Sequence, residues 1–260
     1  PPPCRIPISS RGFAGSPVEA LRARHRRPGR RGEERHGAGR RHGARPSPRR
    51  LRSHVPRGGV ARPIERGPAR ERAGELALQG IYLGTSSWKY AGWRGQLYDE
   101  ARYVYRGRFA ETRFERNCLA EYAETFKTVS VDAAYYQFPT TRYLEGLVAQ
   151  VPSDFLFGFK VTDVITLKRF PNLPRFGMQA GDVNEQFLNA GLFVSSFLGP
   201  CEAFRANIGL LMFEFTRFQT RDFPRGREFV QALDQFLGRL PQGWPYGVEL
   251  RNPTFLHPDY

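Results

Sequence analysis

Short apolar runs alternate with helical patterns between residues 81 and 250, and this alternation constrains the fold of the chain most strongly. The runs 155–161 (FLFGFKV) and 208–215 (IGLLMFEF) contain almost no polar residue. A strand that reads this way is buried on both faces, as in a parallel sheet covered by helices. The expected strands are 81–86, 128–131, 155–161, 208–215 and 246–250, and the expected helices are 118–126, 141–151, 183–197 and 225–240.

This order predicts an α/β fold with about five parallel strands and flanking helices. A doubly wound open sheet and a (β/α)8 barrel both fit such a pattern. The chain reaches Tyr260 soon after the fifth strand without a signal that ends a helix. We therefore expect a fragment, comprising either five of the eight strands of a barrel or a nearly complete open sheet.

Residues 1–80 differ in composition from the rest. They hold 20 arginines, no lysine, 6 acidic residues and a single aromatic residue, Phe13, whereas residues 81–260 hold 20 basic and 19 acidic residues. Almost all of the formal net charge of +15 therefore lies in the first part. A segment this poor in apolar residues cannot offset the entropy lost on ordering, so we predict that 1–80 is disordered and that the domain spans 81–260.

Three interpretations of the segment 1–80 remain open. Arg, Pro, Gly, Ala and His are what GC-rich DNA yields outside a true reading frame, so the leading interpretation is that the segment is not genuine coding sequence. A second interpretation is a basic arm that binds nucleic-acid phosphates. A third is a targeting peptide, against which the scattered prolines argue because they interrupt any amphipathic helix.

Several classes of site are absent from the residue pattern. His257 is the only histidine beyond residue 80, and Cys118 and Cys201 are far apart. No Ser-His-Asp triad, HExxH helix or CxxC pair can be assembled, so we predict no metal ligands, and no glycine-rich nucleotide motif identifies a cofactor. No apolar run approaches the ~20 residues of a membrane span, and the low cysteine content favours a cytoplasmic protein.

Ordered sequence blocks resemble one family. Residues 81–98 read IYLGTSSWKYAGWRGQLY, which is similar to the opening motif of the DUF72 (YecE-like) family. The later blocks follow in the same order, namely LAEYAETFKTVSVDAAYYQFP (119–139), VPSDFLFGFKVTDVITL (151–167), GLLMFEF (209–215) and YGVELRNPTFL (246–256). The resemblance implies a TIM-like (β/α)8 barrel, of which this chain looks like an N-terminal fragment. The family is uncharacterised, so the resemblance implies no activity.

Some family positions differ here. The resemblance implies a glutamate in the second strand where this chain has Ser130, and histidines where it has Leu167 and Asn252. A mechanism that uses those histidines as proton carriers is therefore not expected in this chain.

Candidate site residues follow the strands, because the site of a (β/α)8 barrel lies at the carboxyl ends of its strands. Lys160, Glu249 and Arg251 are expected to point into the barrel, since Gly158 shares a face with the first and Gly247 with the other two. The candidate catalytic residues are Asp132, Lys160, Glu214 and Glu249, and the candidate substrate-binding residues are Trp88, Trp93, Arg94, Tyr135, Tyr136, Arg251 and Asn252.

These residue types also have ordinary structural roles. Lys160 with Glu214 or Glu249 would equally form a charge-paired layer that fills the barrel, and Asp132 would equally cap a loop. Whether the chain is an enzyme stays open. The leading hypothesis is an enzyme that acts on a small anionic or sugar-like substrate. One alternative is a protein that binds nucleic acid or processes phosphodiesters, and another is an inactive fragment with exposed strand edges.

Overall fold

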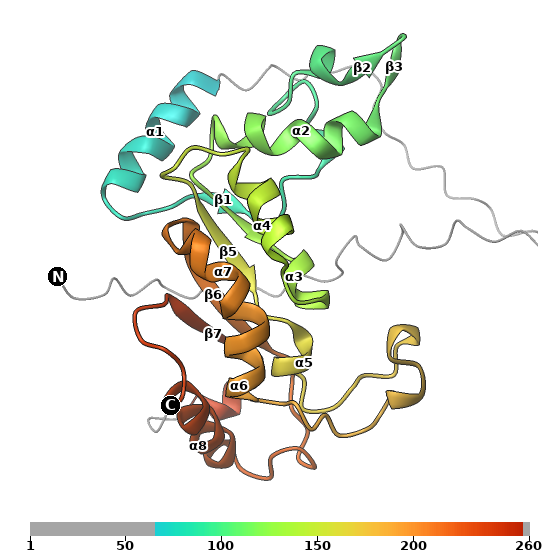
Figure 1. The fold of residues 1–260 in the computed structure, drawn as a ribbon, viewed down its shortest axis with the longest axis vertical. Coiled ribbons are helices and arrows are strands. Elements are labelled where there is room, and N and C mark those ends of the chain that lie inside the picture. Colours follow the sequence, from blue (N-terminus) through green and yellow to red (C-terminus); the bar gives the residue numbers. More distant parts are fainter. Residues whose placement is uncertain (1–65, 257–260) are drawn as a thin grey trace, which may run out of the picture. The chain divides into compact units, whose positions relative to one another are not determined.

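The computed structural model describes residues 66–256, so residues 1–65 and 257–260, with His257, lie outside the described part. One sheet of five parallel strands organises this part (Figure 1). The strands are β1 (Gly84–Thr85), β4 (Thr128–Val131), β5 (Leu156–Lys160), β6 (Ile208–Phe215) and β7 (Tyr246–Leu250). Their order across the sheet is their order along the chain. In a doubly wound sheet the order of the strands reverses at a switch point, whereas in a barrel each strand lies next to the one before it in the chain. The prediction of a TIM-like α/β fold is therefore confirmed.

The two faces of the sheet differ in polarity and exposure. The register pairs Ser130 with Gly158, Lys160 with Met212, and Glu214 with Glu249. Because side chains alternate along a strand, these residues lie on one face of the sheet. The opposite face is apolar and buried, and it includes Val129, Val131, Phe157, Phe159, Leu211, Phe213 and Phe215. The charged residues of the sheet are thus gathered on the face that is not packed against the aromatic core.

Helices and short turns connect the strands. The helices are α1 (Arg66–Leu78), α2 (Glu111–Ala123), α3 (Ala133–Tyr136), α4 (Thr141–Val148), α5 (Asp163–Thr166), α6 (Ala190–Phe193), α7 (Gly199–Cys201) and α8 (Gly226–Leu237), and a small hairpin consists of β2 (Val104–Tyr105) and β3 (Arg108–Phe109). Helix α8 buries Phe229, Leu233 and Phe236, which belong to the apolar stripe expected for residues 225–240.

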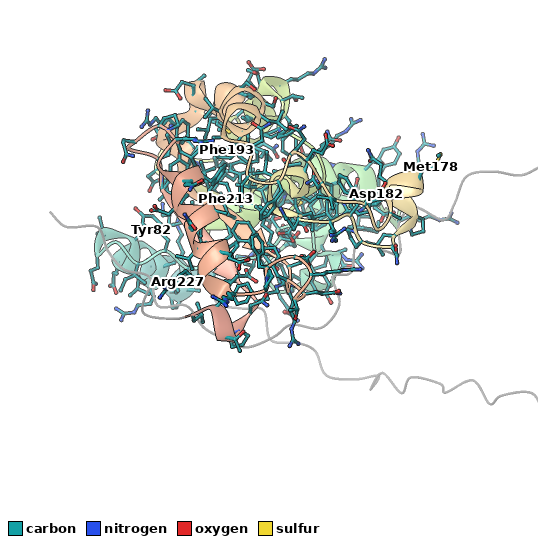
Figure 2. The ribbon with its side chains drawn as sticks, turned by 90° about the horizontal axis from the view of Figure 1, so that it is seen from below. Tyr82, Met178, Asp182, Phe193, Phe213 and Arg227 are labelled. Atoms are coloured by element: carbon teal, nitrogen blue, oxygen red, sulfur yellow. The ribbon has the colours of Figure 1, made fainter. Side chains whose placement is uncertain are left out.

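Aromatic rings fill the space between the sheet and helices α6 and α8. Phe213 of β6 has its ring centroid 5.1 Å from that of Phe193 and 5.2 Å from that of Phe236. Phe193 and Phe213 are fully buried and lie together inside the molecule (Figure 2). This packing fixes β6 in the sheet, where it pairs with β5 and β7.

The three largest differences from the sequence-based expectation concern helices. Helix α2 begins at Glu111 rather than near residue 118. The helix expected at 183–197 begins only at Ala190, because the Asn189 side chain accepts a hydrogen bond from the Leu192 amide at 2.9 Å and caps it. Before that point the Asn184 side chain donates to the carbonyls of Val164 and Leu167, both at 2.7 Å, and holds the chain as a loop.

The third difference is helix α1, which lies inside the segment expected to be disordered. Arg66 Nη1 lies 2.8 Å from Glu121 Oε1, and Ala73 is 4% exposed. The Glu121 carboxylate also accepts hydrogen bonds from the Asp99 amide and the Tyr103 hydroxyl, each at 2.7 Å. A buried carboxylate on α2 therefore orders a helix that composition alone does not predict.

The contact between β1 and β4 leaves no room for a side chain at Gly84. A Cβ atom added there would lie 2.0 Å from the Thr128 carbonyl oxygen. Since that atom belongs to the paired strand, we expect Gly84→Ala to lower the free energy of unfolding by about 2 kcal/mol. A Cβ atom added to Gly146 in α4 would meet no atom within 4 Å, so Gly146→Ala should instead raise stability by up to about 1 kcal/mol. Urea unfolding measures the free energy of unfolding of both variants. Equal changes in Gly84→Ala and Gly146→Ala would contradict this prediction.

Candidate functional site

Charged side chains from four neighbouring strands meet at the carboxyl end of the sheet. We call Asp132, Lys160, Glu214, Glu249 and Arg251 the strand-end cluster. Lys160 Nζ lies 3.3 Å from Asp132 Oδ1 and 2.9 Å from Glu214 Oε2. Arg251 contacts the other Glu214 oxygen and places its Nε 3.1 Å from Glu249 Oε1. The parallel register brings these residues together, because each lies at or within one residue of the carboxyl end of its strand.

Within the strand-end cluster, Glu214 lies deepest. Its side chain is 9% exposed, whereas those of Asp132, Lys160 and Glu249 are between 30% and 38% exposed. Glu214 bridges Lys160 and Arg251 from the buried side. Asp132 and Glu249 contact the same two cations nearer the solvent. The geometry therefore separates one buried anchoring carboxylate from two accessible carboxylates.

The electrostatics of the strand-end cluster keep Lys160 protonated. Burial alone would lower the pKa of Lys160, but hydrogen bonding and the charges of Glu214 and Asp132 outweigh it and raise the pKa above its ordinary value. Lys160 is thus a fixed ammonium at neutral pH. It can stabilise negative charge that develops on a ligand, but it is not a nucleophile or a general base there.

A second group of residues adjoins the strand-end cluster. Tyr135 and Tyr136 lie on α3, with ring centroids 5.3 Å apart, and Asp163 begins α5. The Thr162 hydroxyl donates to the Ala134 carbonyl at 2.7 Å and so ties α3 to the end of β5. Burial raises the pKa of Tyr135 to about 12, and the charges of Asp163 and Glu214 add to this effect. The charge of Glu214 thus links Tyr135 to the cluster.

Arg175 completes this second group from a distant loop. It lies in a turn, η4 (Pro174–Gln179), and its Nη1 is 2.7 Å from Asp163 Oδ2. Its guanidinium carbon lies 4.9 Å from the Tyr136 ring centroid and 5.9 Å from that of Tyr135. Sequence reasoning missed both Arg175 and Asp163. The Asp163 position directly after the strand was a usable signal, but nothing in the sequence shows that residue 175 returns to it.

Three buried carboxylate oxygens around the site lie against cations. Asp132 Oδ1 and Glu214 Oε2 lie 3.3 and 2.9 Å from Lys160 Nζ, and Asp163 Oδ2 lies 2.7 Å from Arg175 Nη1. A buried carboxylate is unfavourable without such a partner, so these cations are needed where they stand.

The side chain of Asn252 is engaged in hydrogen bonds to the backbone and is not open to a ligand. It is 6% exposed, its side-chain oxygen accepts from the Phe218 amide at 2.8 Å, and its side-chain nitrogen donates to the Phe218 carbonyl at 3.0 Å. These bonds hold the loop after β6. We therefore leave Asn252 out of the groups proposed to contact a ligand.

The predicted binding residues Trp88, Trp93 and Arg94 do not join the strand-end cluster through any hydrogen bond, ion pair or ring contact among residues 66–256. Trp88 is 6% exposed and belongs to the core. Trp93 packs edge-on against Tyr90, with centroids 5.2 Å apart. The Arg94 guanidinium lies 4.1 Å from the Phe109 ring centroid. The packing partners of Trp93 and Arg94 thus lie in the loop after β1 and in the β2–β3 hairpin, and a role of these residues in binding stays a prediction.

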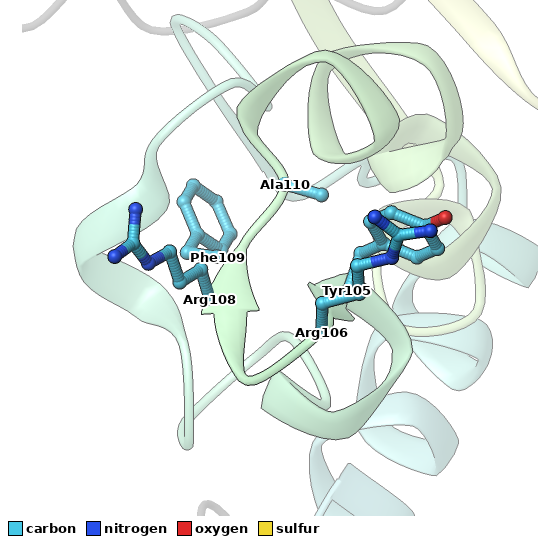
Figure 3. Close-up of a pocket in the computed structure, with 5 residues that line it drawn as sticks. All are labelled: Tyr105, Arg106, Arg108, Phe109 and Ala110. Atoms are coloured by element: carbon cyan, nitrogen blue, oxygen red, sulfur yellow. The ribbon is translucent and has the colours of Figure 1, made fainter.

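A cavity of about 460 Å³ lies elsewhere, on the hairpin of β2 and β3. It is lined by Tyr105, Arg106, Arg108, Phe109 and Ala110 (Figure 3). None of these residues ends a strand of the five-stranded sheet, and none carries a carboxylate.

Among residues 66–256, His, Cys, Asp and Glu side chains form no group of three suited to a metal ion. In the same range, every helix is too short or too polar to cross a bilayer.

Consecutive parallel strands with a charged cluster at their carboxyl ends define a protein of the barrel-type α/β class. Residues 82–260 match the family model described as "Protein of unknown function DUF72", and the chain belongs to this DUF72 family. The resemblance of the sequence blocks is thereby confirmed. A search of curated proteins found no match.

Solved structures of family members are similar to this chain. Two structures of a DUF72 family protein from Enterococcus faecalis are 19% and 20% identical, each with a TM-score of 0.41. They align with 68% of this chain and with 53% and 54% of their own chains. One from Thermotoga maritima is 17% identical, with a TM-score of 0.37, and covers 64% of this chain and 55% of that one. The chain thus spans about half the length of the structures it matches.

Proposed function

We propose that this protein is an enzyme that binds a small, sugar-like ligand at the strand-end cluster and performs acid–base chemistry on it. The observation that carries the proposal is the excess of carboxylates over cations at the carboxyl end of the sheet. Asp132, Asp163, Glu214 and Glu249 face only three cations, Lys160, Arg175 and Arg251, and every cation already contacts a carboxylate. A phosphate or carboxylate ligand would have to displace these ion pairs, whereas hydroxyl groups would donate to them.

The accessible carboxylates suit the hydroxyl groups of a sugar. The side chains of Asp132 and Glu249 are about one-third exposed, so each carboxylate can accept a hydrogen bond from a ligand hydroxyl. The exposed ring of Tyr136 offers an apolar face on which the C–H face of a sugar ring can pack. These features favour the sugar-like member of the two substrate classes that the sequence left open.

Each residue of the strand-end cluster then has a role. Asp132 and Glu249 bind ligand hydroxyls, and Asp132 accepts a proton from one of them because its carboxylate is partly exposed at the end of β4. The Lys160 ammonium stabilises the negative charge left on the ligand oxygen. Glu214 is a positioning residue, since it holds Lys160 and Arg251 from the buried side.

The test measures binding of glucose and glucose 6-phosphate to the full chain by saturation-transfer NMR. We expect glucose to bind, and Lys160→Met to weaken its binding about tenfold through loss of a charge-assisted contact. Lys127→Met is the matched control, because Lys127 forms a 2.8 Å ion pair with Asp154 at the other end of the sheet. Lys127 precedes β4, and Asp154 precedes β5. Lys127→Met should leave glucose binding unchanged.

Two results would overturn the proposal. Binding of glucose 6-phosphate alone, lost in Lys160→Met, would assign the cluster to an anionic substrate. Equal effects of Lys160→Met and Lys127→Met would show that the strand-end cluster is a structural charge layer.

A further inference from the structure

The second group of residues beside the strand-end cluster has the composition of a site for a cation. The rings of Tyr135 and Tyr136 present their faces to the same guanidinium, and a carboxylate, Asp163, lies 2.7 Å from it. Aromatic faces together with a buried carboxylate are the usual means by which proteins bind guanidinium and ammonium groups. We call Tyr135, Tyr136 and Asp163 the cation box. In this structure its occupant is Arg175 of the same chain.

Arg175 reaches the cation box on an arm whose base is fixed. The arm, residues 168–184, folds back on itself through hydrogen bonds from the Asn184 amide to the Lys168 carbonyl at 3.0 Å and from the Gly181 amide to the Phe170 carbonyl at 2.8 Å. Arg169 Nε anchors it to Asp222 Oδ1 at 2.8 Å. The base of the arm therefore has its own contacts, and these do not depend on where the Arg175 side chain lies.

The tip of the arm is exposed. Met178 is 99% exposed, and it lies with Asp182 on a part of the chain that projects away from the core residues Phe193 and Phe213 (Figure 2). Gly177 has a φ of +51° and ψ of −123°, which only glycine adopts readily. At the tip, Arg175 has one ion pair and its ring contacts, including its neighbour Phe176 at 4.3 Å. For Arg175 to leave the cation box, its ion pair with Asp163 and its contacts with the Tyr135 and Tyr136 rings have to break, whereas the contacts at the base of the arm do not.

An emptied cation box would leave Asp163 without its counter-ion. The Asp163 side chain is 9% exposed, and a buried, unpaired carboxylate is unfavourable. Burial raises its pKa above the ordinary value even with Arg175 present. Either a proton or another cation must therefore replace the guanidinium when it departs.

We infer that the cation box is the subsite for a guanidinium or amino group of the ligand, and that Arg175 occupies it as a stand-in until the ligand's own cation enters. This inference rests on the proposed function for the sugar-like part of the ligand and adds a cationic group to it. The ligand class becomes an amino sugar or a related amine-bearing polyol, with hydroxyls on the strand-end cluster and its cation between Tyr135, Tyr136 and Asp163.

The first experiment probes the cation box alone, with methylguanidinium titrated into the full chain. Arg175→Ala removes the internal competitor, so we expect it to bind methylguanidinium at least about tenfold more tightly than the unmodified chain. Arg175→Met, which keeps an apolar stem for packing, should show the same gain if Arg175→Ala unfolds. Adding Asp163→Asn to either variant should abolish the gain.

Arg205→Ala is the matched control. Arg205 also lies over an aromatic ring, Trp244 at 4.6 Å, and also pairs with a carboxylate, Glu202 at 3.4 Å, but that carboxylate is 62% exposed. Its removal should create no methylguanidinium site. Equal binding by the Arg175 variants and the unmodified chain, or a gain that survives Asp163→Asn, would overturn the inference.

The second experiment compares glucosamine with glucose on the unmodified chain. We expect glucosamine to bind about tenfold more tightly, in line with a charge-assisted contact, and Asp163→Asn to remove this preference while glucose still binds. Equal binding of the two sugars would overturn the amine subsite and leave the proposed function intact. If neither glucose nor glucosamine binds while methylguanidinium behaves as expected, the proposed function is overturned and the cation box is retained.

Discussion

Replacing Glu121 by alanine is expected to lower the free energy of unfolding by about 3 kcal/mol, the loss typical when one partner of a buried charged network is removed. Glu121 is 2% exposed and accepts hydrogen bonds from the Asp99 amide, the Tyr103 hydroxyl and the Arg66 guanidinium, at 2.7, 2.7 and 2.8 Å. The substitution leaves all three donors without their acceptor. Helix α1 should then lose its anchor before the rest of the domain unfolds.

Glu124→Ala is the matched comparison for Glu121→Ala. Glu124 directly follows α2, is 46% exposed and pairs with Arg102 at 3.4 Å. Because exposed ion pairs contribute little, this change should shift stability by no more than about 0.5 kcal/mol. Chemical unfolding gives both values, and hydrogen exchange over residues 66–78 reports on α1. Similar losses for the two variants, or unchanged exchange in Glu121→Ala, would contradict the assigned role.

Replacing Glu214 by glutamine is expected to weaken glucose binding about tenfold, as much as removing the Lys160 charge itself, because Lys160 loses the buried carboxylate that positions it. Glu214 alone holds Lys160 and Arg251 together, with its Oε2 2.9 Å from Lys160 Nζ and its other oxygen on Arg251. A neutral amide cannot compensate both charges. Both cations would then relax toward Asp132 and Glu249, and the accessible carboxylates would lose their positions.

The same variant has a pH signature. Burial lowers the pKa of Lys160, and Glu214 contributes the main opposing interactions, so the pKa should fall in Glu214→Gln. In the unmodified protein the folded-state pKa of Lys160 is raised. Its stabilising contribution is therefore complete below the ordinary lysine pKa and is lost as the pH rises through the raised value. In Glu214→Gln this alkaline loss should begin at lower pH.

NMR titration of the Lys160 side chain, together with unfolding at several alkaline pH values, measures this shift. Glu202→Gln is the control, because Glu202 pairs only with exposed Arg205 among the described residues. It should change neither the Lys160 titration nor glucose binding. An unchanged Lys160 pKa in Glu214→Gln would contradict the bridging role of Glu214.

Much of the strand-end cluster was predictable because parallel strands obey simple rules. The apolar runs locate the strands, the barrel rule places their carboxyl ends together, and side-chain alternation puts Lys160, Glu214 and Glu249 on one face. The structure brings these three residues and Asp132 into one cluster, as the residue pattern indicates. Whether they act on a ligand stays a prediction.

The residues that escaped prediction depend on long-range contacts. Arg175 meets Asp163 because an irregular arm folds back, and no periodicity encodes that path. Helix α1 forms in an arginine-rich stretch because Glu121, far along the chain, neutralises Arg66. The burial of Trp88 could not be predicted for another reason. An aromatic residue in a loop has the same sequence signal whether it packs in the core or contacts a ligand, and only the folded chain shows that Trp88 is 6% exposed.

The consecutive order of the parallel strands also affects how fast the domain can fold. Neighbouring parallel strands cannot be joined by a tight turn, and β6 at Ile208 must find β5, which ends at Lys160, across the whole arm and helix α6. Each such closure orders a long connection before its contacts compensate the lost chain entropy. We therefore expect slow folding, with the apolar strands of a newly synthesised chain exposed while these long connections close.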